Sequence, residues 1–469
     1  MLKSAIQDVL RRGCRPARVA AVVAPFLLLV GNGAFADGPT IKLLKTLPVP
    51  VSAANNTAGA MYSFDISFVD PKTGTYYLAD RSNKAVDIAQ GGKGPVTQVF
   101  PNNGHAAFAG FTPCVPPAGA NDCAGPNGVV ANFPWLFMTD APSRVLTFDL
   151  RSSPPKTVSE VTTKAGEKTR ADELAYDPED GLLLVINNAA DPPFGTLIKV
   201  DKTTGGLTVQ STIIFDKAHG VDATNGAEQP VWDRQSRKFF LSIPELSGDG
   251  STNLHGAVLR ISTKGVVEAT YKVDFCGPAG LAKGPGNDLL VGCNTVFDTA
   301  GKKWTGNADR DTASAAPQYV IIDAKTGAID ANVLGVGAGD EVWFNAGDGH
   351  YYTASSGSPL APNAITPARP PVGTAATAPV LTAQGAAILG VIDAGSKTLD
   401  QLVPTLNVPA VKATDAVAGG HPAGTAHSVA AHKHQVFVPL AANNVFPDCL
   451  KGCIAVYGSG NGKDEGDEK

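Results

Sequence analysis

The segment Glu228-Gln229-Pro230-Val231-Trp232-Asp233, with its continuation through Arg234-Gln235-Ser236-Arg237-Lys238 to Ile243, decides the fold. An acid stands directly before a short apolar run, a polar turn follows, and a second apolar run ends at Ile243. Two β-rich apolar runs joined by a short polar turn predict a β-hairpin. Weaker copies of this unit recur along the chain, so the fold and the role of Glu228 are inferred from the whole set of copies.

Seven copies of the unit can be read from the N-terminal to the C-terminal half of the chain. Each begins at a residue directly before an apolar run: Asp65, Asn127, Asp172, Glu228, Gly277, Asp340 and His427. Each copy supplies three strands, and segments such as 207–214 and 266–273 supply a fourth. Repetition of one four-stranded unit is typical of a β-propeller. The sequence therefore predicts an all-β, seven-bladed β-propeller, with a six-bladed ring and an unclosed sandwich as alternatives.

The ends of the repeat predict how the ring closes. The seventh copy lacks a fourth strand, and the strand expected at 41–47 can supply it and remove an exposed edge. Residues 37–457 are thus predicted to form a single β-propeller domain. The Pro- and Ala-rich segment 355–383 is expected to be an insertion in the sixth blade, as a loop or a lid. Residues 458–469, rich in glycine and charge, are expected to be a disordered tail.

The first 36 residues have the pattern of a signal peptide. A basic region precedes an apolar stretch from Val19 to Val30, and Ala34-Phe35-Ala36 places small residues where a signal peptidase cleaves. An uncleaved membrane anchor is the alternative, but the apolar stretch is short for a membrane span. We expect a periplasmic or secreted protein that has no membrane attachment after cleavage.

Cysteine usage and charge agree with an exported protein. Beyond the signal, six cysteines form three close pairs: Cys114 with Cys123, Cys276 with Cys293, and Cys449 with Cys453. In an oxidising compartment such pairs predict three local disulfides. Half of a zinc site is the alternative for the last pair, but no second pair of ligands has a matching spacing. The net charge of −5 without a basic stripe argues against nucleic-acid binding.

The starts of the inner strands of a propeller form a ring at the mouth of its central channel. The expected ring contains Asp65, Asn127, Asp172, Glu228, Gly277 or Pro278, Asp340 and His427. A register error of one residue would place Glu173 and Glu341 in the ring instead. Like charges this close raise one another's pKa, and a divalent cation with oxygen ligands would relieve the repulsion. Local turn chemistry is the alternative for any single acid.

The histidines divide into one ring residue and several others. His427 could add a nitrogen ligand to a cation in the ring. His219 lies in the loop that leads to Glu228 and could reach the mouth as an acid/base group. His105, His255 and His350 are expected to be structural or surface residues.

Two family resemblances bear on function. Glu228-Gln-Pro-Val-Trp-Asp resembles the Glu-x-Pro-x-Trp strand start of the SMP-30/gluconolactonase-like propellers, and Asn127-Gly-Val resembles their Asn-Gly strand start. This resemblance implies a channel cation, calcium or zinc, held by Glu228 and Asn127 with Asp172 or Asp340 as further candidates. In that family the cation polarises a lactone or ester carbonyl and activates water. Ala426-His-Ser-Val-Ala with Val436-Phe-Val-Pro-Leu resembles instead the seven-bladed YncE-like periplasmic propellers, which implies a binding or scaffold role.

Two functions are therefore expected. The first is a metal-dependent hydrolase of a lactone, ester or related small molecule at the channel mouth, with calcium or zinc as cofactor. Its metal ligands would be Glu228, Asn127, Asp172, His427 and Asp65, and its acid/base groups His219 and Asp340. The second is a non-catalytic propeller that binds a small ligand or a periplasmic protein partner.

Overall fold

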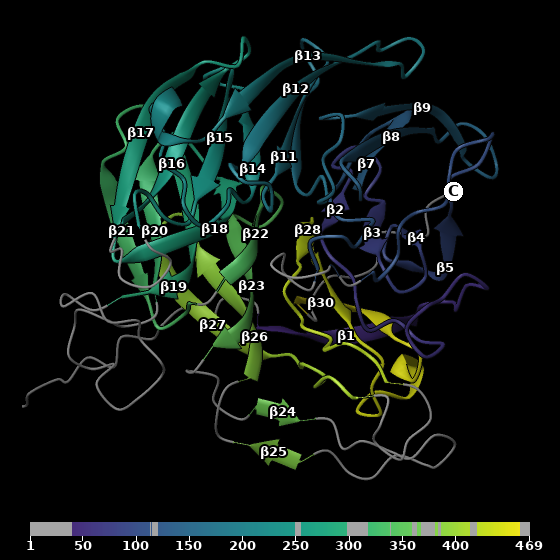
Figure 1. Ribbon diagram of the computed structural model, residues 1–469. Helices are drawn as coiled ribbons and strands as arrows, with labels where there is room; N and C mark the ends of the chain where they lie inside the picture. The colour runs from purple at the N-terminus through teal and green to yellow at the C-terminus, as the bar shows by residue number, and fades with distance from the viewer. Residues whose placement is uncertain are drawn as a thin grey trace, which may run out of the picture. The chain divides into compact units, whose positions relative to one another are not determined.

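The computed structural model describes most of the chain after the predicted signal (Figure 1). The described residues are 40–112, 114, 121–248, 255–297, 318–337, 339–358, 364–366, 380–382, 386–412 and 420–459. The predicted signal peptide at 1–36 and residues 460–469 of the predicted tail lie outside them. The described residues belong to one compact unit and contain strands and short 3-10 turns but no α-helix. No helix among them is long and apolar enough to cross a membrane.

Strand pairing within the described residues gives five four-stranded antiparallel sheets, one eight-stranded sheet and one two-stranded hairpin. The two four-stranded halves of the eight-stranded sheet are joined by a single parallel pairing of His255 with Cys276, so we count each half as a blade and number seven blades in chain order. Blade 1 contains β2 (Ser67–Val69), β3 (Tyr76–Asp80), β4 (Ala85–Gln90) and β5 (Lys93–Val99). Blade 2 contains β6 (Val129–Asn132), β7 (Trp135–Asp140), β8 (Arg144–Asp149) and β9 (Lys156–Thr162). Blade 3 contains β10 (Leu174–Asp177), β11 (Leu182–Asn187), β12 (Phe194–Val200) and β13 (Leu207–Ile214).

The remaining blades follow the same plan. Blade 4 contains β14 (Pro230–Asp233), β15 (Lys238–Ile243), β16 (His255–Ser262) and β17 (Val267–Asp274). Blade 5 contains β18 (Cys276–Lys283), β19 (Asp288–Val296), β20 (Gln318–Asp323) and β21 (Ile329–Leu334). Blade 6 contains β22 (Gly339–Asn345), β23 (His350–Ser358), β26 (Ala386–Asp393) and β27 (Thr398–Pro404). Blade 7 contains β28 (Ala430–His432), β29 (Gln435–Leu440), β30 (Cys453–Ser459) and β1 (Ile41–Pro48).

Blade 4 shows why the repeated unit folds as a hairpin. Asp233 ends β14, and its carboxylate accepts hydrogen bonds from the Gln235 backbone N–H at 3.0 Å and the Ser236 hydroxyl at 2.6 Å. Arg237 then adopts a positive φ of 55°, which completes the reversal into β15. An Asp side chain that bonds its own backbone two residues on is a common way to stabilise such a turn.

The blades form a closed ring. Each inner strand contacts the next in the order β2, β6, β10, β14, β18, β22 and β28, and β28 contacts β2. The ring is closed at the chain ends, where β1 pairs antiparallel with β30 from Ile41 opposite Ser459 to Pro48 opposite Cys453 (Figure 1). The predicted closure by the first strand is therefore confirmed, and β30 has no exposed edge.

The hydrophobic core lies between neighbouring blades. Leu184 and Ile186 of β11, for example, share one cluster of buried apolar side chains with Phe239 and Leu241 of β15. In β11 and β15 nearly every residue is buried, because the neighbouring blades cover both faces of these strands. This explains the continuous apolar runs that follow each turn in the sequence.

Two further expectations concern the insertion and the cysteines. Within 355–383, the described residues contain a small hairpin of β24 (Ala364–Thr366) and β25 (Val380–Thr382), where a loop or lid was expected. The rest of that insertion lies mostly outside the described residues. All three predicted disulfides are confirmed: Cys114–Cys123, Cys276–Cys293 and Cys449–Cys453. The described residues also form the 3-10 turns η1 (Lys217–His219) and η3 (Pro447–Cys449).

Candidate functional site

Four predicted ring residues occupy the same position in their blades. The backbone N–H of each donates a hydrogen bond to the second strand of its own blade. The pairs are Asp65 to Ala79 (2.9 Å), Asn127 to Thr139 (3.0 Å), Asp172 to Ile186 (2.7 Å) and Glu228 to Ser242 (2.9 Å). The register deduced from the apolar runs is therefore correct for these four blades.

A buried arginine lies between two of these ring residues. Arg81 follows β3 and is only 2% exposed. Its Nη2 forms an ion pair with Asp65, and its Nε donates to Oδ1 of Asn127 at 2.9 Å. The Asn127 amide in turn donates to the carbonyl oxygens of Ala124 at 3.0 Å and Ala171 at 2.9 Å. The Asn127 side chain is thus fully engaged in structural hydrogen bonds.

A second arginine neutralises the ring acid of blade 3. Arg170 Nη2 lies 2.8 Å from Oδ2 of Asp172. Burial raises the pKa of Asp172 to about 7, although Arg170 pulls it down. The other oxygen, Oδ1, is buried and has no hydrogen-bond partner among the described residues.

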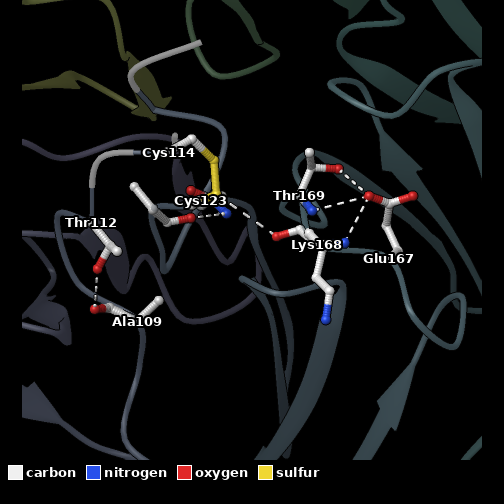
Figure 2. Close-up of a disulfide and its surroundings, with 9 residues drawn as sticks. Ala109, Thr112, Cys114, Cys123, Glu167, Lys168 and Thr169 are labelled. Atoms are coloured by element: carbon white, nitrogen blue, oxygen red, sulfur yellow. Dashed lines mark hydrogen bonds between the residues drawn. A yellow bond between two sulfur atoms is a disulfide. The ribbon is translucent and has the colours of Figure 1, made fainter. Parts of the chain in front are cut away.

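Asp122 and Cys123 contact the segment that carries Arg170. The Arg170 backbone N–H donates to the carbonyl oxygen of Asp122 at 2.7 Å. Figure 2 shows the adjacent Cys114–Cys123 disulfide, with Cys123 Sγ 3.8 Å from the carbonyl oxygen of Lys168. The Glu167 carboxylate binds the backbone N–H groups of Lys168 and Thr169, which fixes the same segment (Figure 2). The sequence spacing of the two cysteines does not reveal this contact.

His427 completes the charged set beside Asp65. Its Nε2 lies 3.3 Å from Oδ1 of Asp65, and its Nδ1 lies 2.8 Å from the carbonyl oxygen of Thr425. A carbonyl oxygen only accepts, so Nδ1 carries a hydrogen. Burial alone would lower the pKa of His427, but the hydrogen bond with Asp65 and the charge of Asp340 raise it. Burial would likewise raise the pKa of Asp65, but Arg81 and His427 hold it well below its usual range.

A group of glutamates is coupled to this set. Glu173 and Glu341 are 6% and 4% exposed, and burial raises their pKa well above the usual value. Repulsion among Glu173, Glu228, Glu341 and Asp340 adds to the shift. Gln229 Nε2 donates to Glu341 at 3.1 Å, but no cation pairs with these glutamates among the described residues. Both register alternatives, Asp172 or Glu173 and Asp340 or Glu341, therefore contribute to one acidic cluster.

Two adjoining cavities open at this end of the ring. The first has a volume of about 160 Å³, and its lining includes Asp65, Arg81, Arg170, Asp340 and His427. The second has a volume of about 320 Å³, and its lining includes Glu228, Glu245, Pro278, Asn294 and Phe297. The linings meet where Asn294 Nδ2 approaches Oδ1 of Asp340 at 3.4 Å.

His219 does not line either cavity. It lies in η1 with a side chain that is 54% exposed, and its Nδ1 contacts Oδ1 of Asp216 at 2.6 Å. The Asp216 side chain also caps this turn by accepting from the His219 backbone N–H. This local cap orients His219 toward Asp216, an arrangement that its position before Glu228 does not reveal.

Four of the five predicted metal ligands already have other polar partners, and the fifth, Glu228, lines the second cavity without an ion-pair partner among the described residues. Asp65 and Asn127 bind Arg81, Asp172 binds Arg170, and both nitrogens of His427 have contacts. Among the described residues, no three His, Asp or Glu ligand atoms of the ring lie within 4.8 Å of one another. Asp65 and Asp172 therefore each already have a guanidinium partner, and Asp65 also contacts the His427 imidazole. Cation binding by this set stays a prediction that chelation would test.

Comparisons with known proteins show the fold. No family model and no curated protein sequence matches the chain. Solved structures do match: the mitotic checkpoint complex (10% identity, TM-score 0.53, covering 96% of this chain and 98% of that chain) and the hydrazine synthase of Kuenenia stuttgartiensis (12%, 0.54, 86% and 96%). The WD40 β-propeller domain of Doa1 also aligns (11%, 0.49, 90% and 98%). At these identities the likeness concerns the fold alone and does not single out either family that the sequence resembles.

Proposed function

We propose that the 160 Å³ cavity binds a small polar molecule and that the protein hydrolyses a lactone or ester bond there. The observation that carries the proposal is the meeting of Arg81, Arg170 and His427 with the carboxylate of Asp340 around one cavity. This arrangement combines hydrogen-bond donors for a developing negative charge with groups that can move a proton.

Asp340 is the candidate general base. Within the described part of the chain, its carboxylate has one side-chain hydrogen bond, from Asn294 Nδ2 at 3.4 Å. Burial raises the pKa of Asp340, which makes its carboxylate a stronger base than a solvent-exposed one. It would take a proton from the water that attacks the carbonyl carbon.

The cationic groups would act on the oxygens of the substrate. Arg81 and Arg170 would stabilise the oxyanion that forms when water adds to the carbonyl carbon. As the C–O bond breaks, the leaving oxygen would take a proton from the His427 imidazolium. Asp65, which contacts both Arg81 and His427, would hold them in place.

The two cavities favour a substrate with two unlike ends. The reacting polar end would occupy the first cavity, and a less polar part would contact Pro278 and Phe297 in the second. Their sizes fit a small molecule better than a polymer.

A panel of small lactones and aryl esters tests the proposal on tag-free protein, before and after chelation and calcium refilling. Turnover that is insensitive to chelation supports this mechanism. Turnover that requires calcium would instead support the cation-dependent mechanism of the lactonase-like family. No turnover above the buffer rate on any substrate would overturn the hydrolase proposal.

The second candidate is ligand or partner binding without turnover. It is favoured by the ion pairs that engage Arg81 and Arg170, because such a rigid network suits recognition. One similar structure is that of a mitotic checkpoint complex, which gives an analogy for a protein partner only at the level of the fold. We further propose export to the periplasm or the exterior, which the three disulfides and the pattern of residues 1–36 support.

A further inference from the structure

Three neighbouring strands of blade 6 bring a histidine and two aspartates together away from the channel mouth. His350 begins β23, Asp393 ends β26, and Asp400 lies in β27. His350 Nε2 is 3.2 Å from Oδ2 of Asp400 and 4.0 Å from Oδ2 of Asp393. One ligand atom from each of the three lies within 4.8 Å of the others. Among the described residues, this is the one group with that property.

The other face of the histidine is also occupied by a carboxylate. Nδ1 of His350 is buried and faces Oδ1 of Asp348 at 3.6 Å. Oδ2 of Asp348 accepts a hydrogen bond from the Tyr352 hydroxyl at 2.7 Å, which fixes this carboxylate. Metal-bound histidines commonly direct their second nitrogen to a carboxylate, which sets the tautomer and leaves Nε2 as the ligand.

The carboxylate of Asp393 is fixed by a hydrogen bond to one of its two oxygens. Its Oδ1 accepts from the backbone N–H of Ser396 at 2.5 Å in the turn between β26 and β27. Its Oδ2 remains directed toward His350. The carboxylate is therefore anchored by one oxygen while the other is available as a ligand.

We propose that His350, Asp393 and Asp400 form a binding site for a transition-metal dication such as Zn²⁺. One imidazole nitrogen and two carboxylate oxygens suit zinc, which binds both types at about 2.0–2.2 Å in tetrahedral geometry. Calcium prefers six to eight oxygen ligands and fits this set poorly. Three protein ligands leave a position for water or for a group from another molecule.

The distances between the three ligand atoms are close to those around a tetrahedral zinc ion. Tetrahedral ligands at about 2.1 Å from zinc lie about 3.4 Å apart, close to the 3.2 Å and 4.0 Å observed from His350. The side chains of Asp393 and Asp400 are 36% and 40% exposed, so an ion can enter from solvent. Contacts with Asp348 and Asp400 raise the pKa of His350 to about 9, so zinc must displace a proton.

The site is separate from the proposed hydrolase cavity. His350 stands at the far end of β23 from Ser355, which pairs with Gly339 next to Asp340. Five residues of strand correspond to roughly 17 Å. The proposed zinc site therefore does not depend on the proposed hydrolysis. A negative result for zinc binding would leave the hydrolase proposal standing, and absence of turnover would leave the zinc site standing.

Isothermal titration of tag-free protein with zinc chloride tests the site, with zinc content measured after gel filtration. The six cysteines of the domain are paired in disulfides, so thiolates do not compete. Wild type should bind one zinc ion per chain. His350→Gln and Asp400→Asn should each weaken binding at least tenfold, and Asp348→Ala should weaken it by roughly 10- to 100-fold.

His219→Gln is the matched control, because His219 faces a single carboxylate, that of Asp216. This variant should bind zinc as wild type does, and circular dichroism should show that all variants keep the fold. Absence of zinc binding by wild type would overturn the inference. So would full binding by His350→Gln, or loss of binding in His427→Gln, which would place the ion at the channel mouth instead.

Discussion

Replacing Arg81 with methionine should strongly destabilise the protein. Arg81 is 2% exposed, and its guanidinium pairs with Asp65 and donates to Asn127. Removing one partner of a buried ion pair costs about 3 to 5 kcal/mol, since the other charge stays buried without compensation. His427 still faces Asp65 in the variant, so we expect the lower end, about 3 kcal/mol.

Urea unfolding followed by tryptophan fluorescence measures this cost. The double variant Arg81→Met with Asp65→Asn removes both charges and should recover at least about 1.5 kcal/mol relative to the single variant. Arg237→Met is the control, because Arg237 forms an exposed pair with Asp180 and its loss should cause no measurable change. Equal urea midpoints for Arg81→Met and wild type, with equal slopes, would refute the idea that Arg81 compensates the ring acids.

Three further predictions concern closure, cross-linking and pH. Leu47→Ala in β1, where the side chain is 6% exposed, should cost about 3 kcal/mol in urea unfolding, whereas Leu44→Ala, 44% exposed, should cost almost nothing; equal effects would contradict the closure by β1. Replacing Cys276 and Cys293 with serine opens a link between residues 17 positions apart and should cost about 3 kcal/mol, and an unchanged midpoint would argue against that disulfide. Burial raises the pKa of Asp140 to about 7, above its unfolded value of 3.8, so its contribution is fully present below about pH 4 and is lost as pH rises toward 7. Between those pH values, wild type should lose up to about 4 kcal/mol more stability than Asp140→Asn, and parallel pH profiles would contradict the shift.

The repeat in the sequence was sufficient to predict the β-propeller and its closure. Each copy buries the second strand on both faces, so the apolar run is continuous and its start is easy to align. The aligned starts Asp65, Asn127, Asp172 and Glu228 indeed share one backbone register. The pairing of β24 with β25 was not predicted, because the Pro- and Ala-rich composition of that segment favours a loop.

The same alignment could not predict that arginines pair with the acids of the ring. Arg81 and Arg170 lie on connections rather than at strand starts, so aligning the apolar runs leaves them out. A usable signal exists for both: Arg170 stands two residues before Asp172, and Arg81 follows the strand that returns to the mouth of blade 1. Cationic side chains on the connections therefore compensate acids at the strand starts, without any metal ion being required for Asp65 and Asp172.

The cluster on blade 6 shows a different limit of sequence reading. His350, Asp393 and Asp400 come from three strands, and Asp393 lies beyond the insertion from His350. Only the pairing of β23 with β26, and of β26 with β27, brings them together. His350 alone was expected to be a structural or surface residue.

The catalytic efficiency of Asp340→Asn on the best substrate of the ester and lactone panel tests the central claim most directly. The account predicts a fall in kcat/KM of at least about 100-fold, because a general base contributes roughly 10²- to 10⁴-fold. His219→Gln, which alters the histidine outside the cavity, should leave kcat/KM unchanged. An active Asp340→Asn variant, or an inactive His219→Gln variant, would contradict the assignment of function to the channel mouth.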